Sequence, residues 1–184
     1  MNKTLQNGFT LIELLIAIAI AAILTAIAVP SYQYFMAGNR VAAEMDGFVA
    51  DLQYARAAAI KQGQNTTVCA STNNTSCSNS VPWNRGWIVF LDVNGDGVRD
   101  SATDTLLRVH GPLSNGNYID SMTGNGSVQH LISFNRFGML TGGTSGGTSG
   151  TITLHAPTDV KALRRCVVIS IVGKLSSDSG SNCP

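Results

Sequence analysis

The run from Phe9 to Val29 is the most constraining feature of the sequence, because its 21 consecutive positions carry a single charge, at Glu13. A helix needs about 20 apolar residues to cross the hydrocarbon core of a bilayer. In a chain of 184 residues, the remainder is poorly suited to surround such a helix on every side. The run therefore predicts a single membrane-spanning helix, with the lipid bilayer as a partner.

A cleaved secretory signal peptide is the alternative interpretation of this run. The triplet Ala26-Ile27-Ala28 has the small-x-small form of a signal-peptidase site. However, the apolar run is longer than the roughly 7–15 residues usual in signal peptides, and residues 1–8 carry only Lys3 as a basic residue. These two differences favour a retained anchor.

Glu13 requires an explanation, because an acidic side chain costs up to about 2.5–3.5 kcal/mol at the bilayer centre and less near its edge. If the chain were cut after Gly8, the new amino group of Phe9 would lie about one helical turn from Glu13. In a bundle of parallel helices, Glu13 of one subunit could neutralise the amino terminus of its neighbour. The alternative is a glutamate that is merely tolerated at the membrane edge.

The string Gly8-Phe9-Thr10-Leu11-Ile12-Glu13-Leu14-Leu15-Ile16 resembles the class III leader junction of type IV prepilins and pseudopilins. The resemblance implies that a prepilin peptidase cuts between Gly8 and Phe9 and methylates the Phe9 amine. It implies that Glu13 helps to recruit the subunit into a filament. An inner-membrane assembly platform is a further implied partner. The implied location is the bacterial inner membrane with a periplasmic head, and the cell surface once a pilus has assembled.

The anchor is expected to continue as an amphipathic helix over residues 30–62. Pro30 removes one backbone donor, which favours a kink over a stop, and Gly63 is the expected end. The whole helix over residues 9–62 would be about 80 Å long at 1.5 Å per residue. Apolar positions at helical spacing define its buried face: Val41, Met45, Phe48, Leu52, Ala55 and Ala59. Charged residues are expected mostly on other faces: Arg40, Glu44, Asp46, Asp51 and Arg56.

Beyond Gly63 the pattern changes to short apolar runs bounded by turn residues, which is typical of antiparallel strands. The expected strands are residues 66–70, 86–91, 105–109, 128–134, 151–155 and 165–172. The fold class is therefore α+β, with a long N-terminal helix packed on an antiparallel sheet that is either single or split in two. The expected divisions are a leader (1–8), a transmembrane and assembly helix (9–29), its amphipathic continuation (30–62) and a β-rich head (63–184).

The cysteines indicate an oxidising compartment for this head, because they are even in number, at positions 69, 77, 166 and 183. Four cysteines allow three pairings, and local spacing favours Cys69 with Cys77 and Cys166 with Cys183. The sequence has no C-x-x-C motif, which argues against zinc or thioredoxin-like chemistry.

The aspartate-rich segment that begins at Asp92 partly matches a calcium-binding EF-hand loop. Its candidate ligands are Asp92, Asn94, Asp96 and Asp100, with a glycine at the sixth position. Position 12 is Thr103 in place of the bidentate glutamate, and a strand precedes the segment where an EF-hand has a helix. An Asx-rich turn between strands is the favoured interpretation, with calcium binding as the alternative.

No residue pattern supports catalysis or a cofactor. The five residues Gly143-Thr144-Ser145-Gly146-Gly147 match G-x-S-x-G, but they lie in the repeat GGTSGGTSG and lack a strand-to-helix elbow. His110, His130 and His155 are isolated in the sequence and have no evident carboxylate or cysteine partners. Trp83 and Trp87 are expected in the core.

The formal net charge of +1 provides no global attraction to nucleic acid, so any such binding needs a local patch.

Further motifs resemble the FimT/GspH-type subfamily of minor pilins and pseudopilins. They are residues 86–92 through Asp100, then 106–108, 133–138 and 165–170. Members of the subfamily include pilins that prime pilus assembly, a tip-proximal pseudopilin of type II secretion, and pilins that bind DNA during natural transformation. In that subfamily the aspartate-rich segment behaves as a turn.

DNA-binding members carry a G-R-x-R motif after the last strand, and the matching stretch here is Gly173-Lys174-Leu175-Ser176. It keeps one basic position, as a lysine without the bidentate fork of arginine. Lys161, Arg164 and Arg165 could add a nearby patch, and the alternative is solvated charges around a strand.

The sequence therefore predicts a non-enzymatic minor pilin that acts at the tip of a type IV pilus or in initiating its assembly. Its expected partners are other minor and major pilins or pseudopilins. DNA uptake is the first alternative function, and a subunit of a type II secretion filament is the second.

Overall fold

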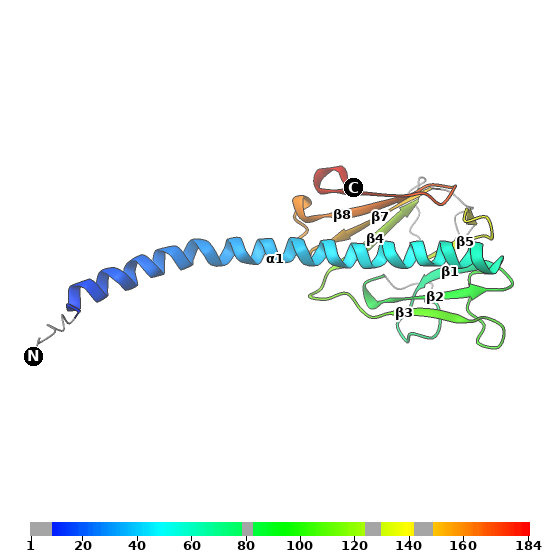
Figure 1. Cartoon of the computed structure of the whole chain (residues 1–184), viewed down its shortest axis with the longest axis horizontal. Coiled ribbons are helices and arrows are strands. Elements are labelled where there is room, and N and C mark those ends of the chain that lie inside the picture. The colour runs from blue at the N-terminus through cyan, green and yellow to red at the C-terminus, as the bar shows by residue number, and fades with distance from the viewer. Residues whose placement is uncertain (1–8, 79–82, 124–129, 142–148) are drawn as a thin grey trace, which may run out of the picture. The chain divides into compact units, whose positions relative to one another are not determined.

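The computed structural model describes residues 9–78, 83–123, 130–141 and 149–184. The chain divides into two compact units, Met1–Ala37 and Gly38–Pro184. One helix, α1 (Leu11–Gln62), begins in the first unit and ends in the second. The α+β class expected from the sequence, a long N-terminal helix with antiparallel sheets, is confirmed (Figure 1).

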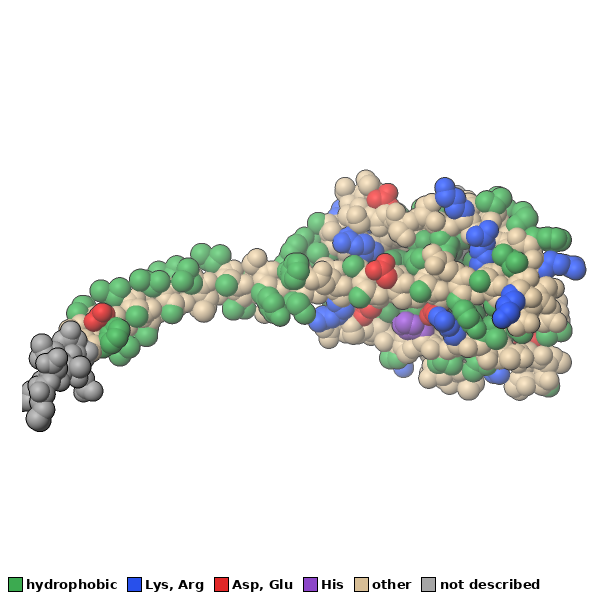
Figure 2. Space-filling model, viewed as in Figure 1, with side chains coloured by type: hydrophobic (Ala, Val, Ile, Leu, Met, Phe, Trp, Pro, Cys, Tyr) green, Lys and Arg blue, Asp and Glu red, His purple; other side chains and the backbone are tan. Residues whose placement is uncertain are grey.

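The first unit is an apolar helix whose side chains are exposed from Phe9 to Met36 (Figure 2). Within the described residues, α1 is the one helix long and apolar enough to cross a membrane. The hydroxyl of Thr25 donates to the carbonyls of Ala21 and Ala22 at 2.9 and 3.0 Å, so the helix itself satisfies this polar group. Pro30 lies inside α1, and the helix continues through it as expected.

The part of α1 in the second unit packs on the head through the face expected from its periodicity. The six apolar residues of that face are each at most 2% exposed: Val41, Met45, Phe48, Leu52, Ala55 and Ala59. The helix ends at Gln62, and Gly63 takes a left-handed conformation (φ 66°), as a helix stop requires.

The assignment of Asp51 to a polar face was wrong, because this residue is 7% exposed. Asp51 lies three positions after Phe48 and four before Ala55, which places it on the buried face of α1. Its burial is compensated by hydrogen bonds from the head, which are described below.

The head contains two antiparallel sheets. The first has the order β3-β2-β1-β5-β6, with strands β1 (Asn65–Ala70), β2 (Trp87–Asp92), β3 (Leu106–His110), β5 (Leu131–Phe134) and β6 (Leu140–Thr141). The second has the order β4-β7-β8-β9, with strands β4 (Tyr118–Thr123), β7 (Gly150–His155), β8 (Arg165–Ile169) and β9 (Leu175–Ser179). Strands β1–β3 lie on one side of α1, and β4, β7 and β8 lie on the other (Figure 1).

The core between α1 and the first sheet is aromatic. Phe48 of α1 makes edge-to-face contacts with Trp83 and Trp87, at centroid distances of 5.3 and 4.9 Å. Trp83 belongs to the 3-10 helix η1 (Trp83–Arg85), and Trp87 begins β2. Both tryptophans are fully buried, as the sequence predicts.

Strands β4, β6 and β9 were not predicted. Strand β9 is an edge strand with largely exposed, polar residues (LSSDS), so it lacks the apolar alternation that marks a half-buried strand. Strand β4 contains Asp120 and Ser121, and β6 has only two residues. The strand expected over residues 165–172 ends at Ile169, because a turn closed by the bond from the Ser170 N–H to the Lys174 carbonyl follows it.

Two disulfides close the head. Cys69 of β1 joins Cys77, and Cys166 of β8 joins Cys183, with Cα–Cα distances of 5.5 and 5.6 Å. This is the pairing that local spacing favours. The second bridge fastens the C-terminal 3-10 helix η3 (Gly180–Asn182) to the second sheet.

We expect thiol titration of the unreduced, denatured protein to find no free cysteine, because all four are bridged. Reduction before denaturation should release four thiols and serves as the positive control. Two free thiols in the unreduced protein would contradict the pairing.

Candidate functional site

The described end of the apolar helix carries two of the predicted assembly residues, Phe9 and Glu13. Thr10 precedes the first helical residue, and its hydroxyl accepts the Glu13 N–H at 3.3 Å. Thr-x-x-Glu is the capping-box pattern, and a carboxylate in the first turn also suits the helix dipole. Glu13 is exposed, and within the described residues no hydrogen bond or ion pair engages its carboxylate. Gly8 lies outside the described residues.

A polar network connects α1 to the first sheet at Asp51. One carboxylate oxygen, Oδ2, accepts from Trp87 Nε1 at 2.9 Å and faces His110 Nδ1 at 3.1 Å, while Oδ1 pairs with Arg108 at 3.0 Å. His110 stacks on Trp87 at 3.9 Å, and Arg108 lies over the Tyr54 ring at 3.9 Å. Burial raises the pKa of Asp51, but the hydrogen bonds from His110, Trp87 and Arg108 outweigh it, so the pKa is lowered from 3.8.

We expect Asp51→Ala to destabilise the head by about 1–3 kcal/mol, because it leaves the buried Trp87 N–H without an acceptor. Since the folded pKa lies below 3.8, the stabilising effect is complete above that pH and disappears as the pH falls through the folded pKa. Urea unfolding of residues 38–184 should therefore show a variant deficit at pH 7 that shrinks in acid. Asp46→Ala, at an exposed position on the same helix, is the control and should change little. Equal effects of the two variants would contradict this role.

His155 occupies a second polar cluster, in a cavity of about 230 Å³ on the second sheet. Its Nδ1 lies 2.7 Å from Asp159, its Nε2 lies 3.5 Å from Asp120, and its ring stacks on Tyr118 at 4.7 Å. Arg164 binds Asp159 through two nitrogens, at 3.0 and 2.8 Å. The hydrogen bonds from Arg164 and His155 lower the pKa of Asp159 to about 2.

The interpretation that the histidines lack carboxylate partners was therefore wrong for two of them. His110 meets Asp51 across 59 positions of sequence, so only the fold brings them together. His155 and Asp159 are four positions apart in the sequence. That spacing predicts a contact in a helix, but His155 lies at the end of a strand, so the pair was not expected. Both clusters connect elements of the head.

The aspartate-rich segment is held by its own backbone. The carboxylate of Asp92 is buried and accepts from the N–H groups of Gly95 and Gly97 and from the Thr67 hydroxyl. Asp104 accepts from the N–H groups of Val93 and Asp100. These are the bonds of an Asx-rich turn. In the described part of the chain, no three His, Cys, Asp or Glu side chains are grouped to hold a metal ion.

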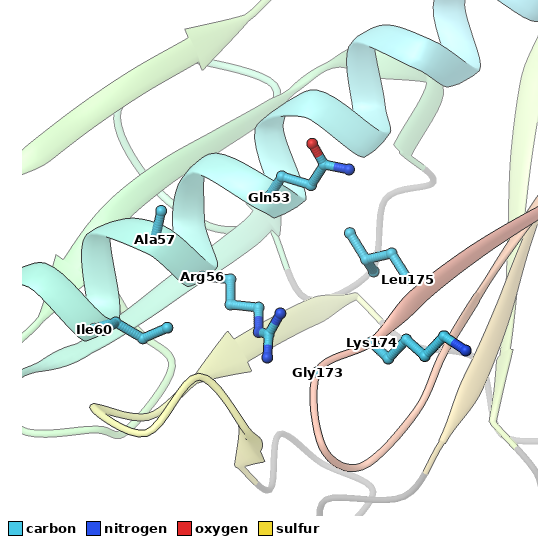
Figure 3. Close-up of a pocket in the computed structure, with 7 residues that line it drawn as sticks. All are labelled: Gln53, Arg56, Ala57, Ile60, Gly173, Lys174 and Leu175. Carbon is cyan, nitrogen blue, oxygen red and sulfur yellow. The ribbon is translucent and has the colours of Figure 1, made fainter.

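A groove of about 570 Å³ lies between α1 and the turn after β8. Its lining residues are Gln53, Arg56, Ala57, Ile60, Gly173, Lys174 and Leu175 (Figure 3). Arg56 donates to the carbonyls of Gly138 and Val172 at 2.8 and 3.3 Å, which fixes its guanidinium at the groove. A Cβ on Gly173 would come within 2.0 Å of the Gly138 carbonyl oxygen, so this close approach of two turns requires glycine.

The comparison with protein families assigns this fold. Residues 44–173 match the family described as type II transport protein GspH, which is 130 of the 184 residues. The chain belongs to the GspH family. Residues 3–29 match the prokaryotic N-terminal methylation motif. The resemblance inferred from the leader junction and the head motifs is thereby confirmed.

Two solved structures have a fold similar to that of this chain. The type IV minor pilin FimU of Pseudomonas aeruginosa superposes with a TM-score of 0.59 at 18% identity, over 79% of this chain and 93% of FimU. The minor pseudopilin EpsH of the type 2 secretion system of Vibrio cholerae has a TM-score of 0.52 at 15% identity, over 76% of this chain and 97% of that one.

Curated sequence relatives are fimbrial proteins. The fimbrial protein EcpC of Eikenella corrodens is 27% identical over 141 residues, which is 72% of this chain and 92% of EcpC. The type IV major fimbrial protein FimA of Dichelobacter nodosus is 56% identical over 43 residues, 23% of this chain. The chain spans only 28% of the length of FimA.

The basic residues proposed for DNA lie at different ends of β8 in this GspH-family head. Lys161 in the 3-10 helix η2 (Lys161–Leu163), Arg164 and Arg165 precede or begin the strand, and Lys174 follows its end. A strand of five residues separates the two groups by about 16 Å. Arg164 is bound to Asp159, and Arg165 donates to the Arg164 carbonyl. The structure therefore does not gather these four side chains into one patch.

Proposed function

We propose that the chain is a non-enzymatic minor pilin, a structural subunit of a type IV pilus that acts at its tip or in initiating its assembly. The observation that carries this proposal is the combination, in one chain, of the methylation motif over residues 3–29 with a GspH head over residues 44–173. The similarity to the minor pilin FimU in fold and to fimbrial proteins in sequence supports it.

In this proposal a prepilin peptidase removes residues 1–8 and methylates the amino group of Phe9. Residues 9–29 hold the subunit in the bacterial inner membrane, residues 30–62 continue the helix, and the disulfide-bridged head lies in the periplasm. The exposed apolar side chains of the first unit support this placement, since water would be an unfavourable surrounding for them.

Assembly in this proposal is driven by two interactions. The apolar helices of neighbouring subunits pack together, and Glu13 of one subunit neutralises the amino terminus of the next. The free carboxylate and the adjacent exposed Phe9 support the second interaction. In the low dielectric of a helix bundle such a pair is far stronger than in water.

A pseudopilin of a type II secretion system is the second candidate function. The family description and the fold similarity to EpsH favour it. Both functions need the same processing and anchoring, and they differ in the partner subunits. DNA uptake is not included, because the candidate basic residues lie at opposite ends of β8 and Arg164 is paired with Asp159.

Shearing of cells tests the proposal. If the chain is a pilus subunit, its mature form should be found in the sheared pilus fraction, and inactivation of the prepilin peptidase should confine it to the membrane as a precursor. Cells in which its gene is deleted could instead keep their pili and fail to export enzymes. That result would assign the chain to a secretion system. Release of the chain into the periplasm as a soluble protein would contradict both.

A further inference from the structure

The cavity of about 230 Å³ on the second sheet, here called the His155 cavity, has no part in the function proposed above. The register of β4 with β7 places Tyr118 opposite His155, and Asp120 opposite Thr153. Residues two apart in a strand point to the same face of the sheet, so these side chains gather on one face. The other face of the two strands carries residues of the apolar core: Ile119, Ile152 and Leu154.

The ring of His155 is held in one orientation. The residue is 5% exposed, and its ring stacks on Tyr118 with 2° between the two planes. Its Nδ1 lies 2.7 Å from Asp159, whose carboxylate is fixed in turn by two nitrogens of Arg164. A carboxylate only accepts hydrogen bonds, so Nδ1 is the donor and carries a ring proton. A carboxylate that orients an imidazole through one nitrogen is the usual support of a metal-binding histidine.

The second ring nitrogen, Nε2, faces the carboxylate of Asp120 at 3.5 Å. With the proton on Nδ1, the neutral ring has a lone pair at Nε2, so two acceptors face each other. The separation is also longer than the roughly 2.7–3.2 Å of an N–H···O hydrogen bond. A cation bound by both atoms would remove this mismatch.

The separation of the two acceptors fits a zinc ion. Zinc binds imidazole nitrogen at about 2.0–2.1 Å and carboxylate oxygen at about 2.0–2.2 Å, in tetrahedral geometry. Two ligand atoms at those lengths lie about 3.3–3.5 Å apart. Imidazole suits zinc, whereas calcium and magnesium prefer oxygen ligands. All four cysteines are bridged, so this is not a thiolate site.

The charges around the His155 cavity favour a cation. Arg164 is neutralised by its bidentate pair with Asp159. The side chain of Asp120 is 63% exposed, and within the described residues its one ion pair is with His155. Burial, followed by the charges of Asp159 and Asp120, raises the pKa of Tyr118, so the potential at this ring is negative.

We propose that the His155 cavity binds one zinc ion through Nε2 of His155 and the carboxylate of Asp120. The described residues group no three His, Cys, Asp or Glu side chains around one ion, so water takes the remaining positions. Thr151 and Thr153 line the cavity, and their hydroxyls are suited to hydrogen-bond that water. Asp159 is a positioning residue that acts through the ring. The inference is independent of the choice between pilus and secretion filament.

Calorimetric titration of the mature chain in detergent micelles with zinc chloride tests the site. We expect one zinc ion per chain, and Asp120→Ala and His155→Gln should each lower the affinity at least tenfold. Asp159→Asn should lower it by about 10–100-fold, the usual effect of losing an outer-shell partner. Asp46→Ala removes an exposed carboxylate elsewhere, and His110→Gln removes the other histidine that faces a carboxylate. Both controls should bind zinc as the unchanged chain does.

Nitrogen-15 spectra of the His155 ring provide a second measurement. At neutral pH without zinc we expect a proton on Nδ1 only, and the Nε2 signal should shift when zinc is added. Protons on both nitrogens would overturn the proposal, because a charged ring has no lone pair for a metal. Absence of zinc binding, or unchanged binding in Asp120→Ala, would also overturn it. Asp120 is exposed, so this variant decides the matter even if His155→Gln fails to fold.

Discussion

Replacement of Gly8 by valine is expected to leave an unprocessed, membrane-bound precursor with no mature protein. If the peptidase cuts between Gly8 and Phe9, residue 8 must fit against the catalytic groups at the scissile bond, and we expect a branched side chain there to block the approach of the peptide bond. The precursor should keep all eight leader residues, and a gel shift or intact mass detects them.

Thr4→Val is the matched control, because it places the same side chain in the leader away from the junction. It should be processed normally. A mature band of ordinary size from Gly8→Val would contradict the assignment of the leader, and precursor accumulation in both variants would point to a general export defect.

Glu13→Gln is expected to be processed and anchored normally but to be incorporated into filaments roughly tenfold less, or not at all. Loss of an ion pair in a low-dielectric helix bundle costs more than about 1.4 kcal/mol, which is a factor of ten. Glutamine can still serve in a capping box, so this variant removes the charge and keeps the local cap. Quantification of the sheared fraction against the membrane fraction measures the effect.

Thr10→Ala is the complementary control, because it removes the hydroxyl that accepts the Glu13 N–H and keeps the carboxylate. We expect it to assemble. Normal assembly of Glu13→Gln would show that the charge is incidental, and a defect in Thr10→Ala alone would show that the helix cap made by the Thr10 hydroxyl is what assembly needs.

The parts of the fold that could be predicted are those with local periodicity. The buried face of α1 follows from spacings of three and four residues, and the helix stop follows from Gly63. Two disulfides with short loops follow from local spacing. Strand β9 could not be predicted, because an exposed edge strand need not show an apolar pattern.

The polar clusters around Asp51 and His155 could not be predicted from local sequence patterns. Asp51 occupies a position of the apolar face, although the charged residues of this helix were expected mostly on its other faces. Its partners Trp87, Arg108 and His110 come from β2 and β3, and no short-range pattern connects them to α1. The groove between α1 and the turn after β8 was missed for the same reason, since Arg56 and Lys174 are separated by most of the head sequence. Such sites depend on the packing of α1 against sheet edges and turns.

The intact mass of the chain isolated from membranes tests the central claim most directly, that this is a processed and anchored filament subunit. We predict residues 9–184, with one added methyl group on the amine of Phe9 and two disulfides. A chain that begins at Val29, after Ala26-Ile27-Ala28, would identify a secretory signal peptide. That result, or an uncleaved amino terminus at Met1, would contradict the account.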